Sequence, residues 1–145
     1  MGLEWALECK ASWCDLILSG RKSLEVRTYP PPAELDGHKV WLLASLGPEG
    51  VATFGDSIAA GQAGGAVVGW VLFDGAIEYR DAAAFAADEA QHCVPVDSPY
   101  AFTSQGDEGT TLYGWQVVAS HRLAVPLPLP AMRRHHRSVY RCSSG

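Results

Sequence analysis

The spacing of apolar residues changes twice within the first 30 positions of the chain. In residues 4–10 every second residue is apolar, which predicts a strand with one apolar face and one polar face. Trp13, Leu16 and Ile17 then follow the i, i+3, i+4 spacing of a helix face. Residues 23–30 return to alternation and run into consecutive prolines, which cannot donate to a strand ladder. We therefore predict a strand, a short helix and a second strand.

Both ends of the short helix are marked by residues that suit helix termini. Ser12 can cap the N-terminus, and Asp15, three positions later, can satisfy a second free N–H group. Gly20 can adopt the left-handed conformation that ends a helix. We predict that the helix begins at Ser12 and ends after about two turns, before Gly20.

The rest of the chain contains strand patterns, one Ala-rich stretch and one Gly-rich stretch. We predict strands at residues 38–46, at 66–80, in the first part of 110–130 and at 137–142. Residues 81–93 are Ala-rich and begin with Asp81 as a helix cap, so we predict a helix there. The Gly-rich residues 47–65 predict a loop with one helical turn.

This order of elements predicts an α+β fold that is mainly β. Mostly antiparallel or mixed strands with few helices favour a small mixed β-barrel of about six strands with two or three short helices. The chain has 145 residues, of which 48% are hydrophobic and 19% charged, which is typical of one globular domain. We assign residues 1–145 to a single domain and expect a monomer.

Composition excludes several classes of protein. The four cysteines form no C-x-x-C pair, so we expect no metal site, no cofactor and reduced thiols in an intracellular protein, cytoplasmic or nuclear. The start of the chain lacks the pattern of a signal peptide, and no run approaches the roughly 18 apolar residues of a membrane span. The net charge of −5 argues against a broad basic face for duplex nucleic acid.

Cations are nevertheless concentrated in two places. The C-terminal part holds Arg133, Arg134, Arg137 and Arg141 beside two histidines. A second group lies in the stretch GRKSLEVR, residues 20–27. An anion-binding surface would have to combine these groups, and the basic C-terminal run either binds phosphate or is simply solvated.

The charged residues of 20–27 have a spacing that allows two interpretations. On a strand, Glu25 and Arg27 point to the same face, and Lys22 lies at the preceding corner. They either form an ordinary solvated ion pair or hold one ligand between them.

The stretch CKASWCDLILSGRKSLEVR, residues 9–27, resembles the ASCH (activating signal cointegrator homology) superfamily. The mark of that family is G-x-K-x-x-E-x-R after a short helix that opens with an aromatic residue. Gly20, Lys22, Glu25 and Arg27 match the four positions, and Trp13 matches the aromatic one. The Gln-Pro that usually precedes the aromatic residue is Ala-Ser in this chain.

The resemblance implies a PUA-like β-barrel with a cleft lined by the motif. The expected ligand is single-stranded RNA or a modified nucleoside, in RNA processing or metabolism. A base could stack on an aromatic ring, while Glu25 accepts from an amino group and Lys22 and Arg27 hold a phosphate or a carbonyl. The predicted ligand-binding residues are Lys10, Trp13, Lys22, Glu25, Arg27, Tyr29 and Ser45, with Arg21, Arg133, Arg134 and Arg137 as candidates for phosphate.

Two alternative functions stay open. One branch of the family hydrolyses N4-acetylcytidine with a Lys, a Thr and a later Glu; Lys22 matches the Lys, but Glu25 stands at the Thr position, and Glu89 is the candidate for the third residue. In a hydrolase of this kind or a ribonuclease, Lys22 and Glu25 would be catalytic, with Glu25 as general base. In the second alternative, the Pro-paced segment 124–130 binds a protein partner.

Overall fold

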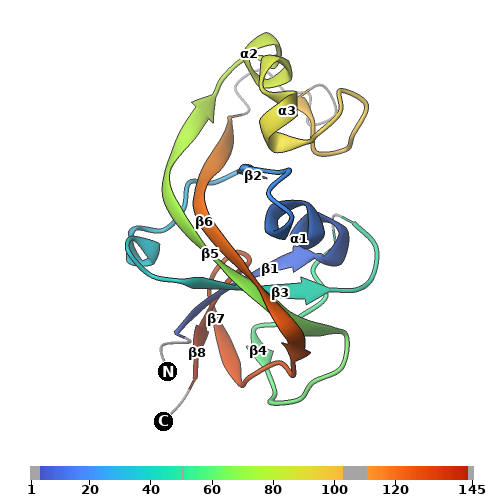
Figure 1. Ribbon diagram of the computed structural model, residues 1–145, viewed down its shortest axis with the longest axis vertical. Coiled ribbons are helices and arrows are strands. Elements are labelled where there is room, and N and C mark those ends of the chain that lie inside the picture. Colours follow the sequence, from blue (N-terminus) through green and yellow to red (C-terminus); the bar gives the residue numbers. More distant parts are fainter. Residues whose placement is uncertain (1–3, 50, 103–110, 144–145) are drawn as a thin grey trace.

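A single curled sheet forms most of the molecule (Figure 1). The computed structural model describes residues 4–49, 51–102 and 111–143. Eight strands form one mixed sheet in the order β2-β6-β5-β3-β1-β8-β7-β4, and the sheet curls into a half-barrel. The strands are β1 (Trp5–Lys10), β2 (Leu24–Arg27), β3 (Val40–Ser45), β4 (Ser57–Ile58), β5 (Gly65–Tyr79), β6 (Leu112–Leu127), β7 (Met132–His136) and β8 (Val139–Cys142). The fold is therefore mainly β, as the sequence predicts, with two strands more than expected.

Short helices fill the gaps around this sheet. They are α1 (Ala11–Leu18), a 3-10 turn (Ala33–Leu35), α2 (Ala82–Ala87) and α3 (Glu89–His92). In Figure 1, α2 and α3 lie beyond one end of the paired β5 and β6, and α1 lies inside the curl near β1 and β2. In the described residues no helix is long and apolar enough to cross a membrane.

Strands β1 and β3 are parallel neighbours at the centre of the sheet, and both are buried on two faces. The prediction for β3 is confirmed, but the one-faced pattern predicted for β1 is wrong. Ala6 and Glu8, on the supposedly polar face, are also buried. That face packs on a second apolar core, around Leu43, Phe54 and Tyr140, which only the tertiary fold supplies.

The turn from β1 into α1 differs from the predicted one. The helix begins at Ala11 directly after the strand, and Lys10 occupies the cap position with an extended backbone. Ser12 therefore lies inside the first turn and is not the cap. Asp15 pairs instead with Arg122 of β6 at 3.1 Å.

The end of α1 is as predicted and aims the next residues toward the inside of the curl. Gly20 has φ of 82°, a left-handed conformation that costs glycine little. The backbone N–H groups of Arg21 and Lys22 both donate to the carbonyl of Leu16. The chain reverses here, and β2 begins two residues later.

Three other segments differ from their predictions for local reasons. The helix predicted at 81–93 is capped by Asp81, whose carboxylate accepts from the N–H of Ala84 at 2.8 Å, but it breaks at Asp88. In the described part of 47–65 the structure has the two-residue strand β4 and no helical turn. The basic stretch at 132–136 is strand β7, which the sequence missed because a strand near the edge of a sheet can keep charged side chains in water.

A glycine in β5 sets how closely α1 can approach the sheet. A Cβ atom at Gly69 would meet the carbonyl oxygen of His121 and lie 2.8 Å from Leu18 of α1. We predict that Gly69→Ala lowers the free energy of unfolding by about 1–3 kcal/mol, because it overpacks this contact. Denaturant titration measures the loss. Gly55→Ala is the control, since a Cβ there meets nothing within 4 Å; equal stability of the two variants would contradict the prediction.

Candidate functional site

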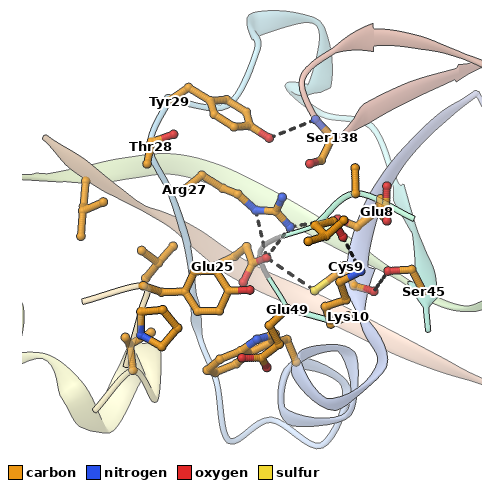
Figure 2. Close-up of a pocket in the computed structure, with 18 of the residues that line it drawn as sticks. Glu8, Cys9, Lys10, Glu25, Arg27, Thr28, Tyr29, Ser45, Glu49 and Ser138 are labelled. Carbon is orange, nitrogen blue, oxygen red and sulfur yellow. Dashed lines mark hydrogen bonds and ion pairs between the residues drawn. The ribbon is translucent and has the colours of Figure 1, made fainter. Parts of the chain in front are cut away.

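A cavity of about 540 Å³ opens between β2, the β1–α1 turn and the loops that follow β3 and α3. All seven predicted ligand-binding residues line it, although they come from four elements, β1, α1, β2 and β3, and from the segments on either side of β2. Figure 2 shows many of them around one hollow, with Glu25 and Arg27 on one strand and Cys9 and Lys10 on another. The curl of the sheet thus brings the edge strand β2 opposite β1, across the open side of the half-barrel, although the two strands are not neighbours in the sheet.

The carboxylate of Glu25 is the most connected group in the cavity. Its Oε2 atom accepts from Arg27 at 2.7 and 3.1 Å and from the thiol of Cys9 at 3.6 Å. Its Oε1 atom lies 3.8 Å from the Lys22 amine and accepts no hydrogen bond from the described residues. Glu25 is only 5% exposed, so it is a buried carboxylate that keeps one oxygen available to a ligand.

Arg27 joins the two sides of the cavity. Besides its two bonds to Glu25, its guanidinium donates to the backbone carbonyl of Glu8 at 3.0 Å. Among the described strands, β2 pairs only with β6, so this contact ties the other side of β2 to β1. An Arg is suited to this role because its planar guanidinium donates in several fixed directions.

Lys22 is buried at the bottom of the same group and is 2% exposed. Its amine donates to the carbonyl of His92 and lies 4.7 Å from the centre of the Trp13 ring. His92 is itself buried and satisfied, since its ring bonds the carbonyl of Phe85 and the N–H of Val94. Lys22 therefore holds the end of α3 against the cavity and supports the ring of Trp13.

Burial and mutual attraction act in opposite directions on these charges. Burial alone would raise the pKa of Glu25, but Arg27 and Lys22 outweigh it and hold that pKa below its ordinary value. Burial lowers the pKa of Lys22, and Glu25 opposes this only in part. For Arg27, burial is the largest single effect and would lower the pKa, but the attraction and hydrogen bond of Glu25, together with Tyr29 and Cys9, outweigh it and raise that pKa. Glu25 and Arg27 are thus ionised together at neutral pH.

Cys9 is a cavity residue that the sequence reasoning did not select. It is 4% exposed, and its thiol donates to Glu25. The contact with the Cys14 thiol, burial and the negative charge of Glu25 all raise the pKa of Cys9 well above its ordinary value. Cys9 is therefore a protonated thiol that donates a hydrogen bond. All four cysteines are free, as predicted.

The other predicted residues hold the walls of the cavity. The amine of Lys10 donates to the carbonyl of Val51 at 2.7 Å and to the hydroxyl of Thr53 at 2.9 Å, which fixes the loop after β3. Ser45 is 1% exposed, and its hydroxyl approaches the carbonyl of Cys9 at 3.4 Å. The hydroxyl of Tyr29 accepts from the N–H of Ser138 at 3.3 Å, so Tyr29 joins the cavity to the β7–β8 turn.

One wall is apolar, and apart from Trp13 its residues were not predicted from the sequence. Trp13 is half-buried, and its ring meets that of Tyr100 edge to face at 6.0 Å. Val94, Pro99 and Leu112 extend this wall. These residues come from the loop after α3 and the start of β6. No periodic signal marks a loop residue that reaches a site through tertiary folding.

The four arginines predicted to bind phosphate lie outside the cavity. Arg134 has internal partners, namely Asp56 at 2.8 Å and the carbonyls of Phe54 and Arg137. Arg21 and Arg133 are exposed. Arg137 is exposed too, but it lies over the ring of Tyr29, a cavity residue, at 5.5 Å. Arg137 and the ring of His136, which meets Tyr29 at 5.2 Å, therefore both contact this cavity residue.

The remaining candidates also lie elsewhere. Glu89 is exposed on α3 and does not line the cavity. The Pro-paced segment forms the end of β6, where Val125 is 72% and Leu127 43% exposed. In the described residues no group of three or more His, Cys, Asp or Glu side chains is placed to hold a metal ion.

The sequence was compared with models of known protein families and with curated proteins, and neither comparison found a match.

Glu25 is the residue whose loss should most disturb this group. We predict that Glu25→Gln lowers the free energy of unfolding by about 3–5 kcal/mol at pH 7, because it leaves the buried Arg27 without its counter-charge. The folded pKa of Glu25 lies below the ordinary value of 4.5, so its stabilising effect is complete above pH 4.5 and is lost as the pH falls through the folded pKa. The difference between wild type and variant should therefore shrink below pH 4.5.

Denaturant titrations at pH 7 and in steps down to acid pH measure both effects. Glu49→Gln is the matched control, because Glu49 also lines the cavity but is exposed; it should change stability by less than about 0.5 kcal/mol. A constant difference between Glu25→Gln and wild type at every pH would argue against an ionised, stabilising Glu25.

Proposed function

We propose that this chain is an ASCH-type domain with a PUA-like fold that binds single-stranded RNA or a modified nucleoside in the cavity. The observation that carries the proposal is the convergence of Lys22, Glu25 and Arg27, three charges of one short sequence motif, on one hollow beside an aromatic ring. An ordinary surface ion pair would be exposed, whereas these three charges are buried. A buried ion pair with a purely structural role would not need an open cavity beside it.

The size and chemistry of the cavity suit a single base. A volume of about 540 Å³ falls within the range of small-ligand sites, roughly 300–1,000 Å³. The ring of Trp13 offers a stacking surface, and the free Oε1 of Glu25 offers an acceptor for a base amino group. The other polar groups are already positioned by internal hydrogen bonds, so the cavity is preorganised for a planar ligand with a polar edge.

The arrangement of the sheet also supports the family proposal. A curled mixed sheet with short helices at its open side fits a PUA-like barrel, and the motif lies at the helix end and strand where the resemblance places it. We assign the protein a role in RNA processing or metabolism on this basis.

The aromatic ring gives the sharpest test of binding, because its removal should leave the charged group intact. We predict that Trp13→Leu weakens binding of a fluorescently labelled single-stranded RNA and of N4-acetylcytidine by about 5- to 150-fold, the value of one lost base stack. Lys22→Ala should weaken both as well, since Lys22 supports that ring. Fluorescence and calorimetric titrations measure the affinities.

Trp70→Leu is the control for the loss of an indole. Trp70 is half-buried on β5, lies under Lys39 at 4.4 Å and does not line the cavity. The Trp70→Leu variant should bind RNA and nucleoside as tightly as the wild type. No binding of RNA or nucleoside by the wild type, or equal effects of Trp13→Leu and Trp70→Leu, would refute the proposed site.

A hydrolase is the second candidate, favoured by the buried Lys22 amine. Burial lowers the pKa of Lys22, and its amine lies 3.8 Å from the Glu25 carboxylate, a pairing of the kind found in catalytic sites. Glu25 would act as general base on water and Lys22 would stabilise the developing negative charge. Glu89 does not line the cavity and so does not complete such a set.

Incubation with N4-acetylcytidine or RNA separates binding from turnover. Release of cytidine or of RNA fragments by the wild type, and a loss of that release in Glu25→Gln that exceeds its loss of binding, is the expected result for a hydrolase. Binding without any product under the same conditions would leave the cavity as a recognition site alone.

A further inference from the structure

The rim of the cavity includes the turn between β7 and β8. Only two residues, Arg137 and Ser138, connect these strands. Ser138 lines the cavity, and its N–H donates to the hydroxyl of Tyr29. In Figure 2 Tyr29 and Ser138 face each other at one side of the hollow, away from Lys10 and Glu49. The side chain of Arg137 therefore projects from the cavity rim.

Arg137 has a left-handed backbone conformation that favours glycine. Its φ is 55°, in the left-handed region, whereas Ser138 has no positive φ. A two-residue hairpin turn with positive φ at its first position favours Gly there. An Arg at this position costs backbone energy, roughly 1–2 kcal/mol. Such a cost at the rim of a cavity is a reason to look for a use of the side chain.

At the cavity rim, the guanidinium of Arg137 in the β7–β8 hairpin is a positive charge that is available to a ligand. It lies over the Tyr29 ring at 5.5 Å, and no ion pair or hydrogen bond engages it among the described residues. Three of its basic neighbours are occupied. Arg134 pairs with Asp56, His135 with Glu34, and Arg141 with Glu4.

The positively charged side chains that line the cavity, in contrast, already have partners within the protein. Arg27 is neutralised by Glu25, Lys22 donates to a carbonyl under Trp13, and Lys10 holds the loop after β3. A phosphate that entered the interior would have to break these contacts and would approach Glu25. A phosphate at the rim would meet an exposed guanidinium, which can bind it with two parallel hydrogen bonds.

We propose that Arg137 is a phosphate-binding residue, which contacts the phosphodiester next to a base held in the cavity. This inference rests on the proposed function and narrows it. The preferred ligand is a nucleotide within a single strand of RNA, and a free nucleoside fills only the interior part of the site. Tyr29 positions the guanidinium through its ring.

The turn itself supplies a variant that separates the side chain from the fold. Arg137→Gly removes the cation and places the favoured residue in the turn, so its melting temperature should equal or exceed that of the wild type. We expect its affinity for a labelled single-stranded RNA octamer of mixed sequence to fall about tenfold at low salt. Its affinity for N4-acetylcytidine should stay unchanged.

Salt dependence gives a second readout. In a plot of log affinity against log salt concentration, the slope for the octamer should be about 0.7 less steep in Arg137→Gly than in the wild type, because one phosphate contact is lost. Arg137→Lys should restore part of the affinity and most of the slope. Arg133→Ala is the control, since Arg133 is an exposed arginine of the same hairpin, and Arg137, not Arg133, lies over the ring of the cavity residue Tyr29; the Arg133→Ala variant should bind like the wild type.

Three outcomes would overturn this inference. The first is an octamer affinity and slope in Arg137→Gly equal to the wild type while Trp13→Leu is impaired, which leaves the proposed function standing. The second is an equal loss in Arg133→Ala, which shows diffuse attraction by the hairpin. The third is a wild type that binds neither octamer nor nucleoside, which removes the proposed function as well.

Discussion

The whole site depends on one buried carboxylate, Glu25, held between Arg27 and Lys22. Burying three charges costs several kcal/mol for each ion unless they are paired and hydrogen-bonded in good geometry. That geometry exists because the curl of the sheet brings β2, an edge strand, opposite β1 at the sheet's centre. Arg27 reaches the carbonyl of Glu8, and the thiol of Cys9 reaches Glu25. The charged group thus closes the open side of the half-barrel and shapes the cavity at the same time.

This double role determines what the cavity offers to a ligand. The positive charges of Arg27 and Lys22 are largely used within the protein, so the floor presents a carboxylate oxygen and the aromatic wall more than it presents free cations. Such a floor favours a flat ligand with polar donors along one edge over an isolated anion. Attraction for an anion then has to come from the rim, where Arg137 stands in water.

Local patterns predicted the parts of this site that lie on regular elements. Alternation along β2 placed Glu25 and Arg27 on one face, and the left-handed Gly20 ended α1 where expected. The sequence did not predict that β1 is buried on both sides, because its second apolar neighbour comes from β8 and the loop around Phe54. It also missed the wall near Tyr100, since loop residues reach a cavity through folding and not through periodicity.

The basic run near the C-terminus shows why the number of positive charges in a sequence does not identify the arginine that meets the site. Its arginines look equivalent in sequence, yet strand β7 alternates their directions and the register with β8 gives each a different neighbour. Arg134 is held by Asp56 and stacks near Tyr140, whose pKa burial raises to about 12. Arg141 pairs with Glu4. Among these arginines, Arg137 at the turn, where the chain leaves the ladder and takes a positive φ, lies over the cavity residue Tyr29. The geometry of a two-residue turn, and not the density of positive charge, therefore decides which arginine meets the site.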